Sequence, residues 1–120
     1  MKYLKTFEIV RSYNKIPEIG DYIISDYEYS DKNWSNYINS KIGKFIKIYR
    51  QSDSLWYIVT YEIEDFIVDQ CLKPTNDQNI IKIIDGKNFI DMHFKLSEIK
   101  YLSGDKEELE ALLAANKYNL

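Results

Sequence analysis

The stretch "IGKFIKIYRQSDSLWYIVTYEI", residues 42–63, decides the fold class of this chain. Residues 42–50 alternate, which predicts a strand with Ile42, Ile46 and Ile48 on one face and Phe45, Lys47 and Tyr49 on the other. Residues 55–63 form a second run rich in β-branched and aromatic side chains, and the polar residues 51–54 between the runs favour a turn. Two such runs joined by a short polar connection are typical of a β-hairpin.

A second hairpin is predicted over residues 80–95. Residues 80–84 are rich in isoleucine, and Asp85-Gly86 tolerates the positive φ angles of a tight turn. Residues 88–94 return with Ile90, Met92 and Phe94 expected to face inward. A short turn of helix and a last strand are then expected within residues 95–102.

The remaining segments carry weaker signals. Pro17 and Gly20 interrupt the chain before residues 21–25, which predict the first strand. Residues 26–41 show no clear period and predict a long loop, and residues 64–79 predict a long connection. Residues 1–18 are expected to form an N-terminal helix or extended segment, with a short helix over 2–13 favoured by apolar residues at helical spacing.

The C-terminal tail, residues 105–118, predicts a helix. Asp105 and Glu108 have the spacing of a capping box, in which the two side chains satisfy each other's backbone N–H groups. Four side chains share one stripe of this helix, namely Leu109, Leu112, Leu113 and Asn116.

These elements predict a single domain over residues 1–120, α+β and mainly β. We expect residues 19–102 to form a small antiparallel SH3-like barrel, preceded by the short N-terminal segment and followed by the C-terminal α-helix. An OB-like barrel and an open α+β sheet are the alternatives.

Composition argues against several classes of protein. The net charge of −3, without a run of Lys or Arg, disfavours binding to phosphate backbones. Cys71 is the only cysteine, so neither an intrachain disulfide nor a cysteine zinc cluster can form. No run approaches the roughly 18 apolar residues of a membrane span, and the charges within residues 1–11 do not fit a signal peptide. We therefore expect no membrane partner and a cytoplasmic location.

No catalytic constellation stands out. Cys71 and His93 could form one Cys–His pair, but alternation with Met92 and Phe94 places His93 on the solvent face of its strand. The acidic clusters at 62–65 and 105–110 match no calcium-loop spacing. The four glycines are isolated, so no phosphate-binding loop exists. The expectation is a non-enzymatic protein with no metal and no cofactor.

Aromatic and acidic side chains gather in residues 26–37, which makes this segment the first candidate for a partner-binding surface. Tyr and Trp are enriched at interface hot spots, and the acids fit a partner with a basic surface. The predicted contact residues are Asp26, Tyr27, Glu28, Tyr29, Asp31, Trp34 and Tyr37. Burial is an open alternative for Tyr27, Tyr29 and Trp34, and it is favoured for Tyr22.

The first hairpin offers a second candidate, a surface for single-stranded nucleic acid or a nucleotide. Small barrels bind single strands through aromatic side chains interleaved with cations. The candidate residues are Lys44, Lys47, Tyr49, Arg50 and Trp56. The alternative is an ordinary hairpin with one core face and one solvated face.

Several segments resemble small uncharacterised proteins of tailed phages and AT-rich bacterial genomes. The resemblance lies in "IGDYII", "IGKFIKIY", "LWYIVTYE", "LSEIKYLS" and "KEELEALLAANKYNL" and spans most of residues 19–120. It implies a phage or mobile-element accessory protein that blocks a host defence, and it brings no catalytic residues. The first hypothesis is therefore a protein-binding module, a phage-encoded inhibitor of a host nuclease or anti-phage defence complex that acts by surface occlusion.

Overall fold

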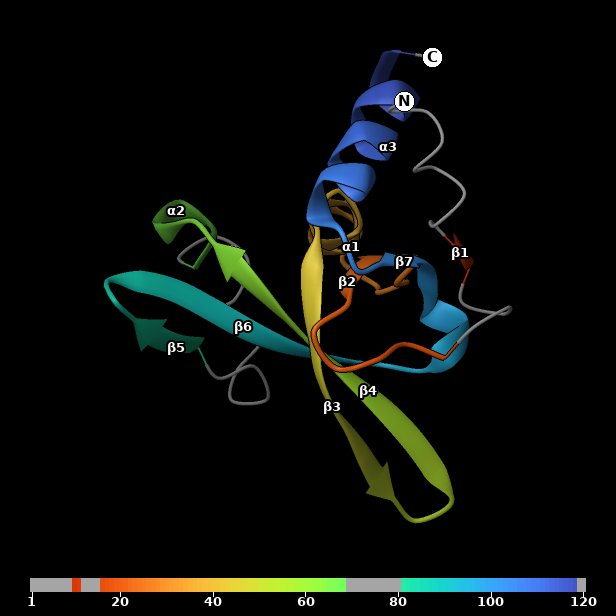
Figure 1. Cartoon of the computed structure of the whole chain (residues 1–120). Coiled ribbons are helices and arrows are strands. Elements are labelled where there is room, and N and C mark those ends of the chain that lie inside the picture. The colour runs from red at the N-terminus through yellow and green to blue at the C-terminus, as the bar shows by residue number, and fades with distance from the viewer. Residues whose placement is uncertain (1–9, 12–15, 69–80, 119–120) are drawn as a thin grey trace.

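The computed structural model describes residues 10–11, 16–68 and 81–118 (Figure 1). The described helical elements are α1 (Lys32–Asn39), α2 (Asp65–Ile67), the 3-10 turn η5 (Leu96–Glu98) and α3 (Lys106–Tyr118). The strands are β1 (Val10–Arg11), β2 (Tyr22–Ser25), β3 (Gly43–Gln51), β4 (Ser54–Ile63), β5 (Ile81–Ile84), β6 (Lys87–Phe94) and β7 (Ile99–Ser103).

The strands form one antiparallel sheet in the order β1-β7-β2-β3-β4-β6-β5. The sheet is open, since no pairing links the edge strands β1 and β5 in the described parts of the chain. The α+β, mainly β class is thus confirmed, whereas the SH3-like barrel is not, because the sheet is not closed. β2 has four residues and β3 has nine, so the far part of the β3–β4 hairpin runs on beyond β2 (Figure 1).

The first predicted hairpin is confirmed, but its predicted faces are wrong. Ser52, in the turn, has a φ of 54°. The register between β3 and β4 shifts between Phe45 and Lys47. The β-bulge there reverses which face of the sheet the following side chains point to. Phe45 is therefore in the core at 1 % exposure, while Lys47 points to the opposite face and Ile48 is exposed.

The second hairpin and the elements after it are confirmed. Asp85 and Gly86 have φ angles of 52° and 76°, as a tight turn requires. Ile90, Met92 and Phe94 are buried. η5 then leads into β7, which lies between β1 and β2 in the sheet and pairs with both.

The loop predicted over residues 26–41 contains a helix instead. The Asp31 carboxylate caps α1 by accepting the backbone N–H groups of Asn33 and Trp34. Trp34 and Ile38, four residues apart on one face of α1, are buried at 2 % and 0 % exposure. Mostly polar residues surround them, which is why the sequence shows no obvious helical period.

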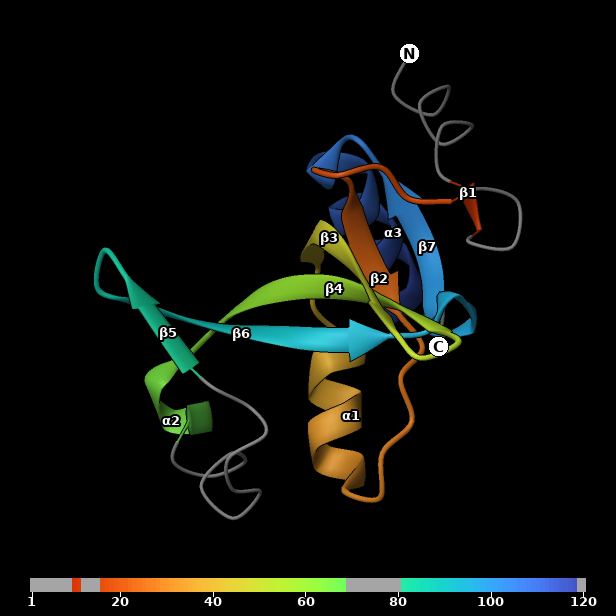
Figure 2. The same cartoon turned by 90° about the horizontal axis from the view of Figure 1, so that it is seen from below.

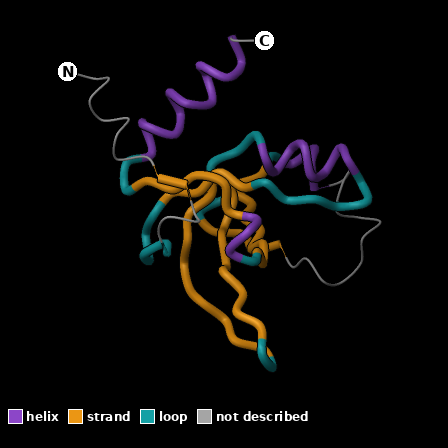
Figure 3. The backbone as a smooth tube through the Cα atoms, turned by 90° about the vertical axis from the view of Figure 1, so that its right-hand side faces the viewer, coloured by secondary structure: helices purple, strands orange, loops and turns teal. Residues whose placement is uncertain are grey.

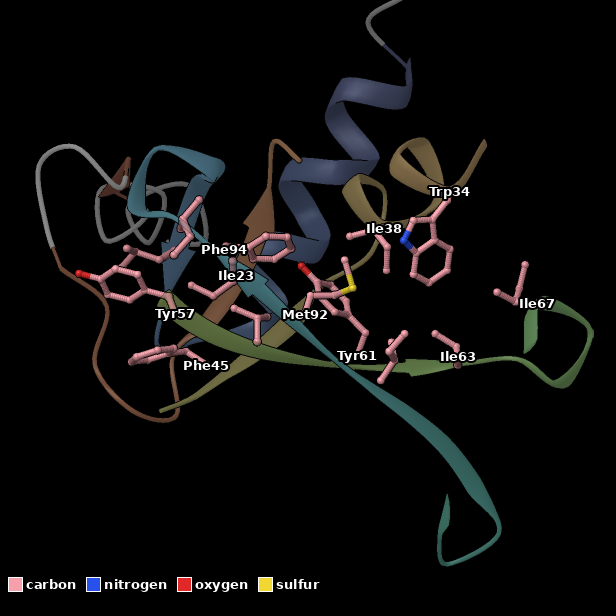
Figure 4. Close-up of a cluster of buried hydrophobic side chains, with 14 residues drawn as sticks. Ile23, Trp34, Ile38, Phe45, Tyr57, Tyr61, Ile63, Ile67, Met92 and Phe94 are labelled. Carbon is pink, nitrogen blue, oxygen red and sulfur yellow. The ribbon is translucent and has the colours of Figure 1, made fainter. Parts of the chain in front are cut away.

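The core lies between α1 and the sheet (Figures 2 and 4). Figure 4 shows Trp34 and Ile38 pointing toward the β4 side chains of Tyr61 and Ile63. α3 packs on β7 and β2, where Leu109 is fully buried, and Figure 3 shows it on the other side of the sheet from α1.

The C-terminal helix is confirmed, although its capping differs from the prediction. Asp105 accepts the backbone N–H of Glu107, whereas the Glu108 carboxylate accepts the hydroxyl of Ser103 at 2.7 Å. Leu112 and Leu113 are half-buried. The predicted helix over 2–13 lies outside the described residues except at Val10–Arg11, which form a strand. Cys71 also lies outside them.

Candidate functional site

The segment from Asp26 to Asp31, here called the acidic loop, is held in place by the side chain of Asn39. The Asn39 amide oxygen accepts the Ser25 hydroxyl and the Tyr27 backbone N–H, each at 2.8 Å. The Asn39 amide nitrogen donates to the Tyr27 carbonyl, also at 2.8 Å. The Asp26 N–H donates to the Glu98 carbonyl at 2.7 Å. The backbone at the start of the loop is therefore tied both to α1 and to η5.

Two tyrosines of the acidic loop stack on each other. The rings of Tyr27 and Tyr29 lie 5.9 Å apart at an interplanar angle of 15°, and Tyr27 also contacts Phe94 at 5.5 Å. Tyr27 is half-buried, and Tyr29 is exposed at 37 %. Burial, with smaller contributions from nearby Tyr29 and Glu98, raises the pKa of the Tyr27 hydroxyl to about 12. Tyr27 thus supports the loop, and Tyr29 is its accessible aromatic ring.

Trp34 has a structural role, which corrects its predicted place on the contact surface, and Tyr37 packs against it while staying half-exposed. Trp34 is in the core, so it cannot reach a partner without opening α1. The Tyr37 ring stacks on Trp34 at 5.8 Å, and its hydroxyl donates to Glu64 at 2.6 Å. That hydrogen bond is the main cause of a lowered pKa for the Glu64 carboxyl, which partial burial opposes and Lys41 supports.

The accessible part of the predicted contact is therefore smaller than the sequence suggested. Asp26, Glu28 and Tyr29 are exposed, as is Asp31, whose carboxylate also caps α1. Tyr22, expected in the core, is half-buried, and its ring lies 6.0 Å from the ammonium of Lys44.

The alternative candidate residues divide between the two faces of the β3–β4 hairpin. The pairing of Lys47 with Ile58 and of Tyr49 with Trp56 places these side chains on the face opposite the core. Arg50 pairs with Leu55 on the other face. Lys44 pairs with Thr60, which also points away from the core cluster.

Two more residues lie on this face, His93 in β6 and Lys95 directly after β6. The sequence did not indicate either of them as a site residue. His93 pairs with Ile58, and its ring lies 6.4 Å from that of Tyr49. The Lys95 ammonium lies 5.5 Å from the centroid of Trp56. Only the pairing of β4 with β6 reveals them, because His93 and Lys95 lie 35 and 39 positions after Ile58 and Trp56 in the sequence. We define the outer hairpin face as Lys44, Lys47, Tyr49, Trp56, His93 and Lys95.

Two other features of the described segments bear on ligand binding, a search for metal-binding clusters and one cavity. They contain no group of three His, Cys, Asp or Glu side chains placed to hold a metal ion. A cavity of about 390 Å³ lies where α3 passes the end of β4, over Ile42, Ile63 and Leu113. Both positive and negative side chains line the cavity, so it favours neither an anionic nor a cationic ligand. The charged residues are Lys41, Glu62, Glu64, Lys106 and Glu110.

Comparison of the chain with protein-family models, with curated proteins and with solved structures gave no match. Of the helices in the described ranges, none has the length and apolar character needed to cross a membrane.

Proposed function

We propose that the chain is a non-enzymatic protein-binding module whose acidic loop occupies a basic surface on a protein partner. The observation that carries this proposal is the set of three hydrogen bonds between Asn39 and its neighbours, which hold the loop in one conformation. A loop that is already ordered loses less conformational entropy on binding, so more of the contact energy appears as affinity.

The exposed side chains of the loop have complementary roles in such a complex. Tyr29 contributes a large apolar ring, backed by the stacked Tyr27, and tyrosine is enriched among interface hot spots. Asp26 and Glu28 lie beside it and are exposed, so their charges act mainly by steering a basic partner and raising the association rate.

In its sharper form, the proposal is a phage-encoded inhibitor of a host nuclease or anti-phage defence complex in the bacterial cytoplasm. Proteins that bind nucleic acid collect Lys and Arg on the surface that meets the phosphates. An acidic loop with an aromatic anchor matches such a surface and would block it by occlusion, without any chemical step.

Capture of partners from a bacterial lysate, followed by affinity measurements with the purified partner, tests the proposal. Tyr29→Ala is expected to weaken binding by about 2 kcal/mol or more if it is a hot spot. Glu28→Lys is expected to slow association and to reduce its dependence on salt. Glu110→Lys, the same charge change at an exposed position of α3, is the control. Equal binding by all three variants would refute the loop as the contact surface.

A further inference from the structure

The outer hairpin face presents two rows of side chains across three strands. Lys47, Ile58 and His93 form one row through the β3–β4 and β4–β6 registers. Tyr49 and Trp56 form the next row, which Lys95 completes through its contact with the Trp56 ring. The β-bulge after Phe45 creates this arrangement, because it moves Lys47 and Tyr49 onto the same face as Lys44.

The rings on this face are accessible. Tyr49 is 46 % exposed, His93 is exposed and Trp56 is half-buried. The hairpin projects from the body of the molecule, with its turn at the far end from α3 (Figure 3). Toward the turn, a flexible chain can therefore lie over β3 and β4 clear of α3, whose residues Lys106 and Glu110 lie near Ile42 and Glu62 at the opposite end of the two strands.

The charge on this face is mainly positive near the turn, and Glu62 of β4 adds an exposed carboxylate at the other end, beyond Thr60. Lys44, Lys47 and Lys95 are exposed and take part in no ion pair within the described ranges. Asp91, two residues before His93 on β6, belongs to the same face, but its Oδ2 binds the Lys82 ammonium at 2.8 Å. The nearest carboxylate of that strand is thus already neutralised.

We propose that the outer hairpin face is a binding site for single-stranded nucleic acid. A single-stranded nucleic acid offers both phosphates, which lysines bind, and unstacked bases, which stack on exposed aromatic rings. Lys44 and Tyr49 lie on the order of 15 Å apart along β3, enough for a few nucleotides. Bases stack on Tyr49 and Trp56 while the three lysines neutralise phosphates. A duplex keeps its base faces covered and is bound more weakly.

This site is independent of the proposed function of the acidic loop. The two surfaces use alternate residues at the end of β6: Phe94 contacts Tyr27 of the loop, and Lys95 contacts Trp56 on the opposite face. A basic protein and a nucleic acid strand can therefore be bound at the same time, and either site can fail without the other.

Fluorescence anisotropy with a labelled single-stranded oligothymidylate tests the site in the full chain. Three neutralised phosphates predict a slope of log affinity against log salt of about −2, since each contributes about −0.7. Tyr49→Ala is expected to weaken binding between about 5-fold and about 150-fold, the range found for one stacked base. Tyr49→Phe keeps the ring and is expected to bind within about 2-fold of the wild type.

Matched controls distinguish binding of the phosphates from binding of the bases. Lys47→Glu is expected to reduce the salt slope by about 0.7 or more. Lys87→Glu, the same change at an exposed lysine at the far end of β6, is expected to leave it unchanged. Inorganic polyphosphate and the corresponding duplex are expected to compete more weakly than the single strand. Absence of binding at low salt, equal loss in both lysine variants, or no effect of Tyr49→Ala would overturn the proposal.

Discussion

Replacement of Asn39 by alanine tests the hydrogen bonds that order the acidic loop. The change removes three hydrogen bonds of 2.8 Å, to the Ser25 hydroxyl and to the N–H and carbonyl of Tyr27. At about 1 kcal/mol each, their loss costs about 3 kcal/mol of unfolding free energy. Alanine favours helix more than asparagine does, which offsets about 0.5 kcal/mol. The expected net loss is therefore about 2.5 kcal/mol.

The loss extends beyond the loop because Ser25 is buried at 2 % exposure and also accepts the Tyr61 hydroxyl at 3.3 Å. Without Asn39, the Ser25 hydroxyl has no acceptor among the described residues, and a buried polar group without a partner is costly. Urea denaturation followed by circular dichroism measures the free energy of unfolding for the wild type and the variant.

Asn36→Ala is the matched control, since Asn36 lies on the same helix but is exposed. Its side chain makes no hydrogen bond to the residues that the structure describes, so the variant is expected to be as stable as the wild type or about 0.5 kcal/mol more stable. A difference of less than about 1 kcal/mol between the two variants would refute the reasoning. The Asn39 bonds would then contribute little net stability, and the loop would not owe its order to them.

Two further predictions concern the core. Gly43→Ala is expected to lower the unfolding free energy by about 1–3 kcal/mol in the same assay, because the new Cβ would lie 2.7 Å from Tyr61 Cε2 and closer still to Val59 Cγ1; a neutral effect would mean that both side chains can move aside. Burial raises the pKa values of Tyr27 and Tyr61 above the ordinary 10.0, so the unfolded chain releases these protons first and the unfolding free energy is expected to fall as pH rises past 10. Urea midpoints across that range measure the fall, and a midpoint that stays constant would contradict it.

The acidic loop shows how far sequence reasoning could reach toward a site. The crowding of aromatic and acidic residues in 26–37 was visible, but the sequence did not show which rings face water. Trp34 is buried because α1 forms and packs on β4, and α1 forms because Asp31 caps it and Asn39 bonds across to the loop. A helix of eight residues is marginal by itself, so these tertiary contacts decide whether it exists.

The amino-acid sequence by itself determined the two hairpins, the Asp85-Gly86 turn and the inward row of Ile90, Met92 and Phe94. These features follow from turn chemistry and a period of two, both of which act between near neighbours in the chain. Only the tertiary structure decided that the sheet stays open, that a bulge brings Lys47 and Tyr49 to the outer face, and that Lys95 meets Trp56. Those outcomes depend on the register between strands distant in sequence, which the pattern of any single strand does not contain.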